Sequence, residues 1–156
     1  MKDIVSNEIY LDSGVWRIRN GREIDYSDGI EHERYIEEVL TSVQDLSSDS
    51  DELTDRAKDW TSEYHFSKKR SQLLNGFEFS SSNRVLEVGC GCGAITRFLG
   101  EKFDDVVSVE GTLARAKLAR LRTKNMSNVN IINAPFQDID FVVKFDIIIC
   151  IGVFEY

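Results

Sequence analysis

Three glycines at alternate positions, Gly89, Gly91 and Gly93, separate a short apolar run from an amphipathic one in the stretch VLEVGCGCGAITRFLGE. A glycine turn between a strand and a helix lets the backbone approach a ligand closely, and the free N–H groups of the helix attract polar or negative groups. The spacing also satisfies G-x-G-x-x-[GA], with Ala94 in the last position, which is typical of dinucleotide sites. The loop alone therefore does not identify its ligand.

Two carboxylates frame this turn. Glu87 lies in the strand two residues before Gly89, where strands that lead into a pyrophosphate loop are usually apolar because neighbouring anions repel. A carboxylate there suits a ligand that carries a positive charge. Glu110 follows Gly91 by 19 residues and ends the next apolar run, where a carboxylate accepts hydrogen bonds from ribose hydroxyls. Glu110 fits either kind of adenosine cofactor, whereas Glu87 argues against a dinucleotide.

The segments on either side of this turn alternate between strand-like and helix-like patterns of apolar residues. Near-continuous apolar runs predict strands over 84–89, 105–111, 128–133 and 145–152, and helical stripes predict helices over 94–103 and 112–125, the second capped by Thr112. Strand–helix alternation of this kind predicts a parallel sheet covered on both faces, in a Rossmann-like, doubly wound α/β fold.

The residues upstream of the sheet follow other patterns. They predict a hairpin over 8–18, a helix over 26–46 capped by Ser27 or Asp28, a helix over 51–66 capped from the polar stretch 47–51, and a short helix over 66–74. Ser67 and Arg70 are expected to cap and solvate that last helix. We therefore divide the chain into a hairpin and helical extension, residues 1–75, and a cofactor-binding part, residues 76–156.

Composition excludes several classes of protein. The 156 residues carry a net charge of −8 without a basic stripe, which argues against nucleic-acid binding. No apolar stretch is long enough for a membrane span, and the N-terminus lacks a signal-peptide core, so a cytoplasmic location is expected. The cysteines, Cys90, Cys92 and Cys150, match no standard zinc spacing, and no metal is expected.

The glycine stretch resembles motif I, E-x-G-x-G-x-G, of the class I S-adenosylmethionine-dependent methyltransferases. VVSVEGT, NIINAPFQDIDF and FDIIICIGVFEY resemble the next three motifs in order and spacing, so the resemblance covers residues 84–156. DYSDG (25–29) and DWTSEYHFSKKRSQLL (59–74) are similar to methyltransferase domains of bacterial surface-polysaccharide and glycosyltransferase loci. The resemblance implies S-adenosylmethionine as cofactor and in-line O-methyl transfer to a saccharide or related small acceptor.

It also implies a contact set for each part of the cofactor. Glu87 would hold the ammonium, and Glu110, followed by Gly111, would bind the ribose. The remaining expected contacts are the methionine-lining backbone of Gly89, Cys90, Gly91 and Gly93; the adenine border of Phe136, Gln137 and Asp138; the sulfonium floor of Cys150, Ile151 and Gly152; and Tyr64 with His65 on a helix that closes over the cofactor. Many relatives carry an aspartate where this chain has Pro135, and no catalytic base is assigned, since a lone histidine beside aromatics is more often packed than catalytic.

A complete domain of this family has a larger sheet than the four strands expected downstream of residue 76. The fold is therefore expected to be truncated after the fourth strand, which leaves that strand as an exposed apolar edge. Association with a glycosyltransferase, or with a missing C-terminal half, would cover it. Two alternatives stay open: a non-catalytic methyltransferase-like module that packs on a partner, and an NAD-dependent oxidoreductase.

Overall fold

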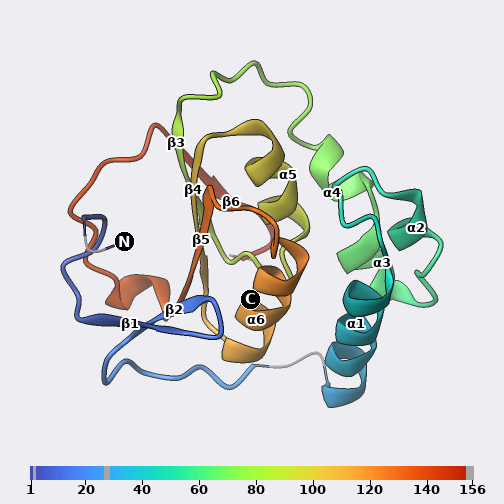
Figure 1. Ribbon diagram of the computed structural model, residues 1–156, viewed down its shortest axis with the longest axis horizontal. Coiled ribbons are helices and arrows are strands. Elements are labelled where there is room, and N and C mark those ends of the chain that lie inside the picture. Colours follow the sequence, from blue (N-terminus) through green and yellow to red (C-terminus); the bar gives the residue numbers. More distant parts are fainter. Residues whose placement is uncertain (2, 27–28, 154–156) are drawn as a thin grey trace.

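The structure is a computed structural model that describes residues 1, 3–26 and 29–153. These residues form one six-stranded sheet in the order β1-β2-β5-β4-β3-β6, in which β1 and β2 are antiparallel and all other neighbours are parallel (Figure 1). The strands are β1 Ile9–Asp12, β2 Val15–Ile18, β3 Arg84–Val88, β4 Asp105–Glu110, β5 Val129–Asn133 and β6 Ile147–Cys150. The four strands expected downstream of residue 76 are confirmed.

The described helices are mostly short. They are α1 Ile30–Ser42, α2 Asp51–Thr54, α3 Trp60–Phe66, α4 Lys69–Gln72, α5 Ala94–Lys102, α6 Leu113–Arg122 and the 3-10 helix η1 Phe136–Asp138.

The sheet is doubly wound, as expected. The crossovers through α5 and α6 carry the chain from β3 to β4 to β5 in one direction, and both helices lie on the same face of the sheet (Figure 1). The connection from β5 to β6 then returns past β3 in the opposite direction. The strand order thus reverses between β3 and β6, and ligands of such sheets bind at the carboxyl ends of the strands at this reversal.

Alternate residues of the central strands feed two separate apolar layers. Val85 and Val106 are fully buried in the layer that α5 and α6 cover. Leu86 and Val107 point to the other face, where Val5 and the stretch around Ile139 cover them. Burial on both faces explains why these strands are apolar at successive positions rather than at every second one.

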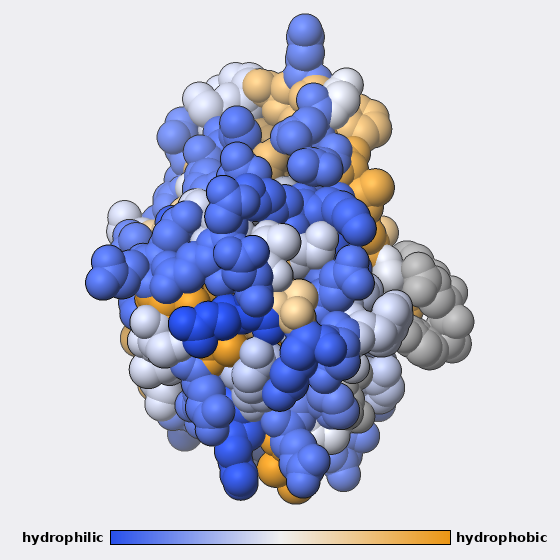
Figure 2. All heavy atoms as spheres, turned by 90° about the vertical axis from the view of Figure 1, so that its right-hand side faces the viewer, coloured by the Kyte–Doolittle hydropathy of each residue, from blue (hydrophilic) through white to orange (hydrophobic). Residues whose placement is uncertain are grey.

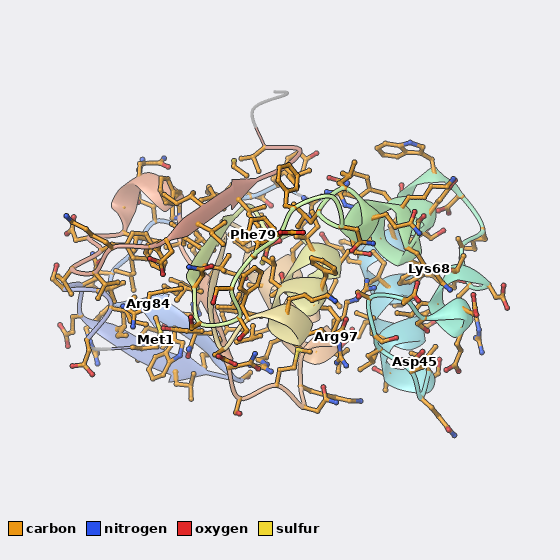
Figure 3. All side chains as sticks on the ribbon, turned by 90° about the horizontal axis from the view of Figure 1, so that it is seen from above. Met1, Asp45, Lys68, Phe79, Arg84 and Arg97 are labelled. Carbon is orange, nitrogen blue, oxygen red and sulfur yellow. The ribbon has the colours of Figure 1, made fainter. Side chains whose placement is uncertain are left out.

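The upstream helices form a third layer outside α6. Leu40 of α1, Leu53 of α2 and Phe66 join one buried cluster with Leu118 of α6. Figure 3 shows the layers in succession from above: Arg84 lies on the sheet, Arg97 on α5, and Asp45 and Lys68 on the outer helical layer. The solvent-facing side of this layer is mainly hydrophilic (Figure 2).

The expected helix over 51–66 is wrong, because the chain breaks it into α2 and α3. Asp59 has an extended backbone, and its carboxylate accepts a hydrogen bond from the Ser62 N–H at 2.8 Å, while the Ser62 hydroxyl accepts from the Asp59 N–H. This capping box starts a new helix at Trp60. At the start of α2, Ser50 accepts from the Leu53 N–H at 3.1 Å, as expected from the polar stretch 47–51.

The expected caps of two other helices, α1 and α6, are not seen in the described residues. The expected caps of the first helix, Ser27 and Asp28, lie outside the described residues, and α1 begins at Ile30. Thr112 occupies the N-cap position of α6, but its side chain does not cap that helix. Its hydroxyl instead donates to Oε1 of Glu110 at 3.2 Å.

The expected hairpin is confirmed, and it is part of the same sheet. Trp16 and Arg17 of β2 align with Ile132 and Asn133 of β5. The Trp16 Nε1 also donates to Oδ1 of Asn130 at 3.2 Å. Residues upstream of the proposed boundary at 75/76 therefore extend the central sheet, and the boundary itself stays a prediction.

Candidate cofactor site

The glycine loop joins β3 to α5 at the reversal of strand order. Gly89, Gly91 and Gly93 have φ values of +75°, +54° and +83°, in the left-handed region that favours glycine. A Cβ on Gly93 would lie 2.8 Å from the Cα of Ala119 on α6, so the loop also needs the missing side chain for packing. The N–H groups of Gly89 and Cys90 donate to the Val109 carbonyl at 2.9 and 3.0 Å, which fixes the turn on β4.

Glu87 is buried beneath this loop with one oxygen saturated. The hydroxyls of Thr96 and Ser108 both donate to its Oε2 at 2.7 Å. Among the described residues no hydrogen bond reaches Oε1, which is available to a ligand. Burial raises the pKa of Glu87 to about 7, and the two hydroxyls only partly oppose that rise.

Glu110 ties the glycine loop to the start of α6. Its Oε2 accepts from the Gly91 N–H at 2.8 Å, and its Oε1 accepts from the Thr112 N–H at 3.0 Å. A carboxylate oxygen has more than one acceptor site, so these bonds leave capacity for hydroxyl donors. The side chain stands at the carboxyl end of β4, where the ribose-binding residue is expected.

A small cavity of about 20 Å³ lies against the glycine loop. It brings together residues expected at the methionine part of the site and adds Arg70, which was expected only to solvate its helix. Its lining consists of Tyr64, His65, Arg70, Glu87, Gly89, Cys90, Gly91, Cys92, Ala94 and Ile95. The sequence shows a cation six residues after Tyr64, but its place at the cavity follows only from the way α3 and α4 fold over the loop.

The segment after β6 closes this cavity from the other side. Gly152 has φ +73°, and a Cβ there would lie 2.8 Å from the Tyr64 hydroxyl. A Cβ on Gly89 would lie 2.3 Å from Cγ2 of Val153, which covers the loop. Cys150 and Ile151, expected at the floor of the site, are half-buried, and burial raises the pKa of the Cys150 thiol.

The residues expected at the adenine lie at a different place, outside the lining of this cavity. Asp138 on η1 forms a two-pronged ion pair with Arg22, at 2.8 and 2.6 Å, and these hydrogen bonds lower the pKa of Asp138. Phe136 is half-exposed on the same helix. Gly111 is covered by Ile24, whose Cδ1 lies 2.8 Å from the position of a Cβ. A strap around Arg22 and Ile24 therefore lies over the ends of β4 and β5, a contact that the sequence patterns do not reveal.

His65 is buried and packed. Its Nε2 lies 3.8 Å from the Cys92 sulfur, and its backbone carbonyl accepts a hydrogen bond from the buried guanidinium of Arg122. This hydrogen bond ties α3, the helix that carries Tyr64, to α6.

The described part of the chain has neither a candidate metal cluster nor a membrane-spanning helix. No cluster of three or more histidine, cysteine, aspartate or glutamate side chains has the geometry of a metal site. No helix in this part is both long and apolar enough to cross a bilayer.

Comparison with known proteins gives a match over much of the chain. The model of the family described as nodulation protein S (NodS) matches residues 41–156, which are 116 of the 156 residues. Cyclopropane-fatty-acyl-phospholipid synthase of Escherichia coli (strain K12) is 27% identical over 89 residues, which cover 56% of this chain and 22% of that protein. The chain thus spans about a fifth of the length of the curated relatives it matches.

Solved structures that resemble part of the chain include two methyltransferases. Phosphoethanolamine N-methyltransferase 1 of Haemonchus contortus, in complex with phosphoethanolamine and S-adenosylhomocysteine, has a TM-score of 0.42 and 15% identity, over 67% of this chain and 21% of that one. The tRNA (m1A58) methyltransferase TrmI of Aquifex aeolicus has a TM-score of 0.38 and 32% identity, over 44% and 28%. Because the family model covers most of the chain, this protein belongs to the NodS family of class I S-adenosylmethionine-dependent methyltransferases.

Proposed function

We propose that the chain binds S-adenosylmethionine at the turn after β3 and serves methyl transfer to a small acceptor, with a saccharide hydroxyl as our first candidate. The observation that carries this proposal is the pair of carboxylates on either side of the glycine loop. Glu87 keeps Oε1 available beside the cavity, and Glu110 stands at the end of β4 with spare acceptor capacity. One suits an ammonium group and the other suits ribose hydroxyls.

The residues around the loop fit such a cofactor. Gly89 and Gly91 offer backbone without side chains, and Cys90 and Gly93 complete the turn. S-adenosylmethionine supplies an electrophilic methyl group on a sulfonium, and the protein's part is to orient it and exclude water. Gly152 and Tyr64 border the open end of the turn and would shield the transfer. The present cavity of about 20 Å³ is far smaller than the cofactor, so binding requires Tyr64 or Val153 to move outward.

The other parts of the cofactor have proposed contacts further along the sheet. We assign the ribose to Glu110 and Gly111, the floor near the sulfonium to Cys150 and Ile151, and the adenine border to Phe136, Gln137 and Asp138. The choice of a saccharide acceptor rests on the similarity of residues 59–74 to methyltransferase domains of surface-polysaccharide loci. It is a narrower proposal than cofactor binding.

The exposed edge of the sheet supports a second candidate function. Ile148 of β6 is 65% exposed at the end of the strand order, a surface suited to a partner. A module that packs on a glycosyltransferase, or on further chain of its own enzyme, without methylating an acceptor by itself would use this edge. The oxidoreductase alternative has no comparable support, because the buried Glu87 disfavours a pyrophosphate.

Calorimetric titration of the purified chain with S-adenosylhomocysteine tests the main proposal. We expect saturable binding, no binding of NADH, and a loss of affinity of about tenfold or more in Glu110→Ala, since a hydrogen-bonded carboxylate contributes roughly 1.5–3 kcal/mol. Glu78→Ala is the matched control, because Glu78 is exposed and does not line the cavity at the loop. Thermal unfolding checks that Glu110→Ala stays folded. A folded wild-type chain that does not bind S-adenosylhomocysteine would refute the proposal and favour the non-catalytic module.

A further inference from the structure

The segment that joins β2 to α1 crosses the carboxyl ends of the central strands (Figure 1). It leaves β2 through a tight turn, in which Asn20 has φ +57° and the Gly21 N–H donates to the Ile18 carbonyl at 3.1 Å. Residues 21–26, which follow, form the strap over the ends of β4 and β5. The family model matches the chain only from residue 41, so the strap is a feature of this chain beyond the matched region.

Two side chains hold the strap on the strand ends. The Nε and Nη2 of Arg22 donate to the two carboxylate oxygens of Asp138, at 2.8 and 2.6 Å. The Cδ1 of Ile24 lies 2.8 Å from the position that a Cβ on Gly111 would take, so Ile24 lies directly on the backbone of a residue without a side chain. The strap thus bridges the end of β4 and the 3-10 helix η1, which follows β5.

The backbone of the strap is not tied to the sheet. Among the described residues, no acceptor receives a hydrogen bond from the N–H groups of residues 22–25. The Arg22 side chain is 67% exposed and Ile24 is 43% exposed. An exposed ion pair contributes little to stability, and segments with few buried contacts open locally at a small cost in free energy. The strap can therefore open without disturbing the strands beneath it.

The strap contacts the residues that the adenosine part of the cofactor would need. The proposed function assigns Gly111 to the ribose and Asp138 to the adenine border. In the structure Ile24 covers Gly111, and both carboxylate oxygens of Asp138 accept from Arg22. Neither Gly111 nor Asp138 lines the cavity at the glycine loop. The adenosine and the closed strap therefore compete for the same two residues.

We propose that the strap is an autoinhibitory latch: when closed it occupies the adenosine end of the cofactor site, and the cofactor binds only after the contact between Arg22 and Asp138 opens. The inference rests on the proposed function and adds a step of control to it. A ligand that binds only the open form has an apparent affinity reduced in proportion to the open fraction. Loss of Arg22 should therefore tighten cofactor binding, whereas loss of a residue that contacts the cofactor would weaken it.

Calorimetric titration with S-adenosylhomocysteine tests the latch in the wild type, Arg22→Met, Arg22→Lys and Arg19→Met. Arg22→Met should bind about two- to fivefold more tightly than the wild type, the range for removal of an exposed ion pair. Arg22→Lys should lie between the two, because lysine keeps the charge and loses the two-pronged geometry. Arg19→Met is the matched control: it removes the same charge and an exposed ion pair with Glu8 at 2.7 Å, and it should bind like the wild type.

Two further measurements approach the latch without removing Arg22. Ile24→Ser keeps the ion pair and removes the apolar contact on Gly111, so it should also tighten binding. Raising the salt concentration to about 0.5 M screens the exposed ion pair and should tighten binding by the wild type relative to Arg22→Met. Melting curves without ligand check that each variant is folded.

The sign of the change decides the outcome. Equal or weaker binding by folded Arg22→Met overturns the latch while cofactor binding stands. Equal tightening in Arg19→Met would assign the effect to net charge and overturn it as well. A folded wild type that does not bind, beside an Arg22→Met variant that does, supports the latch. If none of the folded variants binds S-adenosylhomocysteine, both the latch and the proposed function are overturned.

Discussion

A buried carboxylate with a pKa near neutrality is sensitive to what binds beside it. Glu87 has no salt-bridge partner among the described residues and depends on the hydroxyls of Thr96 and Ser108. Burial raises its pKa to about 7, so at neutral pH the neutral and ionised forms coexist. An ammonium group placed at Oε1 favours the ionised form, and its binding must then release a proton whenever Glu87 starts out protonated.

Cofactor affinity should therefore depend on pH through Glu87. At pH 6 most Glu87 is protonated and must lose its proton to hold the ammonium; at pH 8 most is already ionised. We expect the affinity for S-adenosylhomocysteine to rise about tenfold from pH 6 to pH 8, one decade for each unit below the pKa. Calorimetry in buffers of different ionisation enthalpy should show proton release at pH 6. Glu87→Gln should bind more weakly and without this pH dependence; a persisting dependence would assign the titration to another group.

At the scale of elements, the glycine loop packs directly against α6. Gly93, at the N-cap of α5, has a left-handed conformation, and a Cβ on it would meet the backbone of Ala119 on α6. A methyl group at Gly93 would force an L-residue into the left-handed conformation that such residues disfavour. It would also clash with the Cα of Ala119, and a backbone atom cannot move aside as easily as the end of a side chain can. The site and the packing of its two helices thus depend on the same residue.

Gly93→Ala should lower the free energy of unfolding by about 2–4 kcal/mol, the sum of a left-handed alanine and an overpacked contact. Gly76→Ala is the matched control, because a Cβ there meets nothing within 4 Å, and it should change stability by less than about 0.5 kcal/mol. Urea denaturation of both variants measures the difference. Equal stability of the two would mean that α5 and α6 separate at little cost.

Elements with local signals could be predicted from the sequence, and their long-range partners could not. The apolar runs and the glycine turn specify β3, β4, β5 and β6 to within a few residues. The break between α2 and α3 was missed because the apolar stripe continues through it, while the Asp59–Ser62 capping box decides the local conformation. The hairpin was found, but its pairing with β5 joins residues more than 100 positions apart and leaves no local pattern.

The same limit applies to the candidate site. Glu87, Glu110 and the glycines are specified by their place in strands and turns. Arg70 and the strap contact between Arg22 and Asp138 depend on how separate segments fold over the strand ends. Their residue types signal a cation and a carboxylate, but not which surface each will face.

At the scale of the whole molecule, the two edges of the sheet differ. The antiparallel hairpin adds to the β5 side, whereas β6 ends the other side without a neighbouring strand among the described residues. Ile147 and Ile149 pack in the layer beneath α5 and α6, so Ile148 points to the opposite face, where it is 65% exposed. An apolar, uncharged edge strand of this kind pairs readily with another chain.

Ile148→Lys should therefore reduce self-association of the chain, because a charge on an edge strand opposes strand pairing. Sedimentation velocity over a range of concentrations measures it, with Val142→Lys as the control: Val142 is 59% exposed but lies in the loop before β6. Cofactor affinity should not change in either variant, since neither residue lines the cavity. If Val142→Lys reduces association equally, general surface charge is responsible, not the edge. If only Ile148→Lys does, β6 is the edge through which copies of this chain associate.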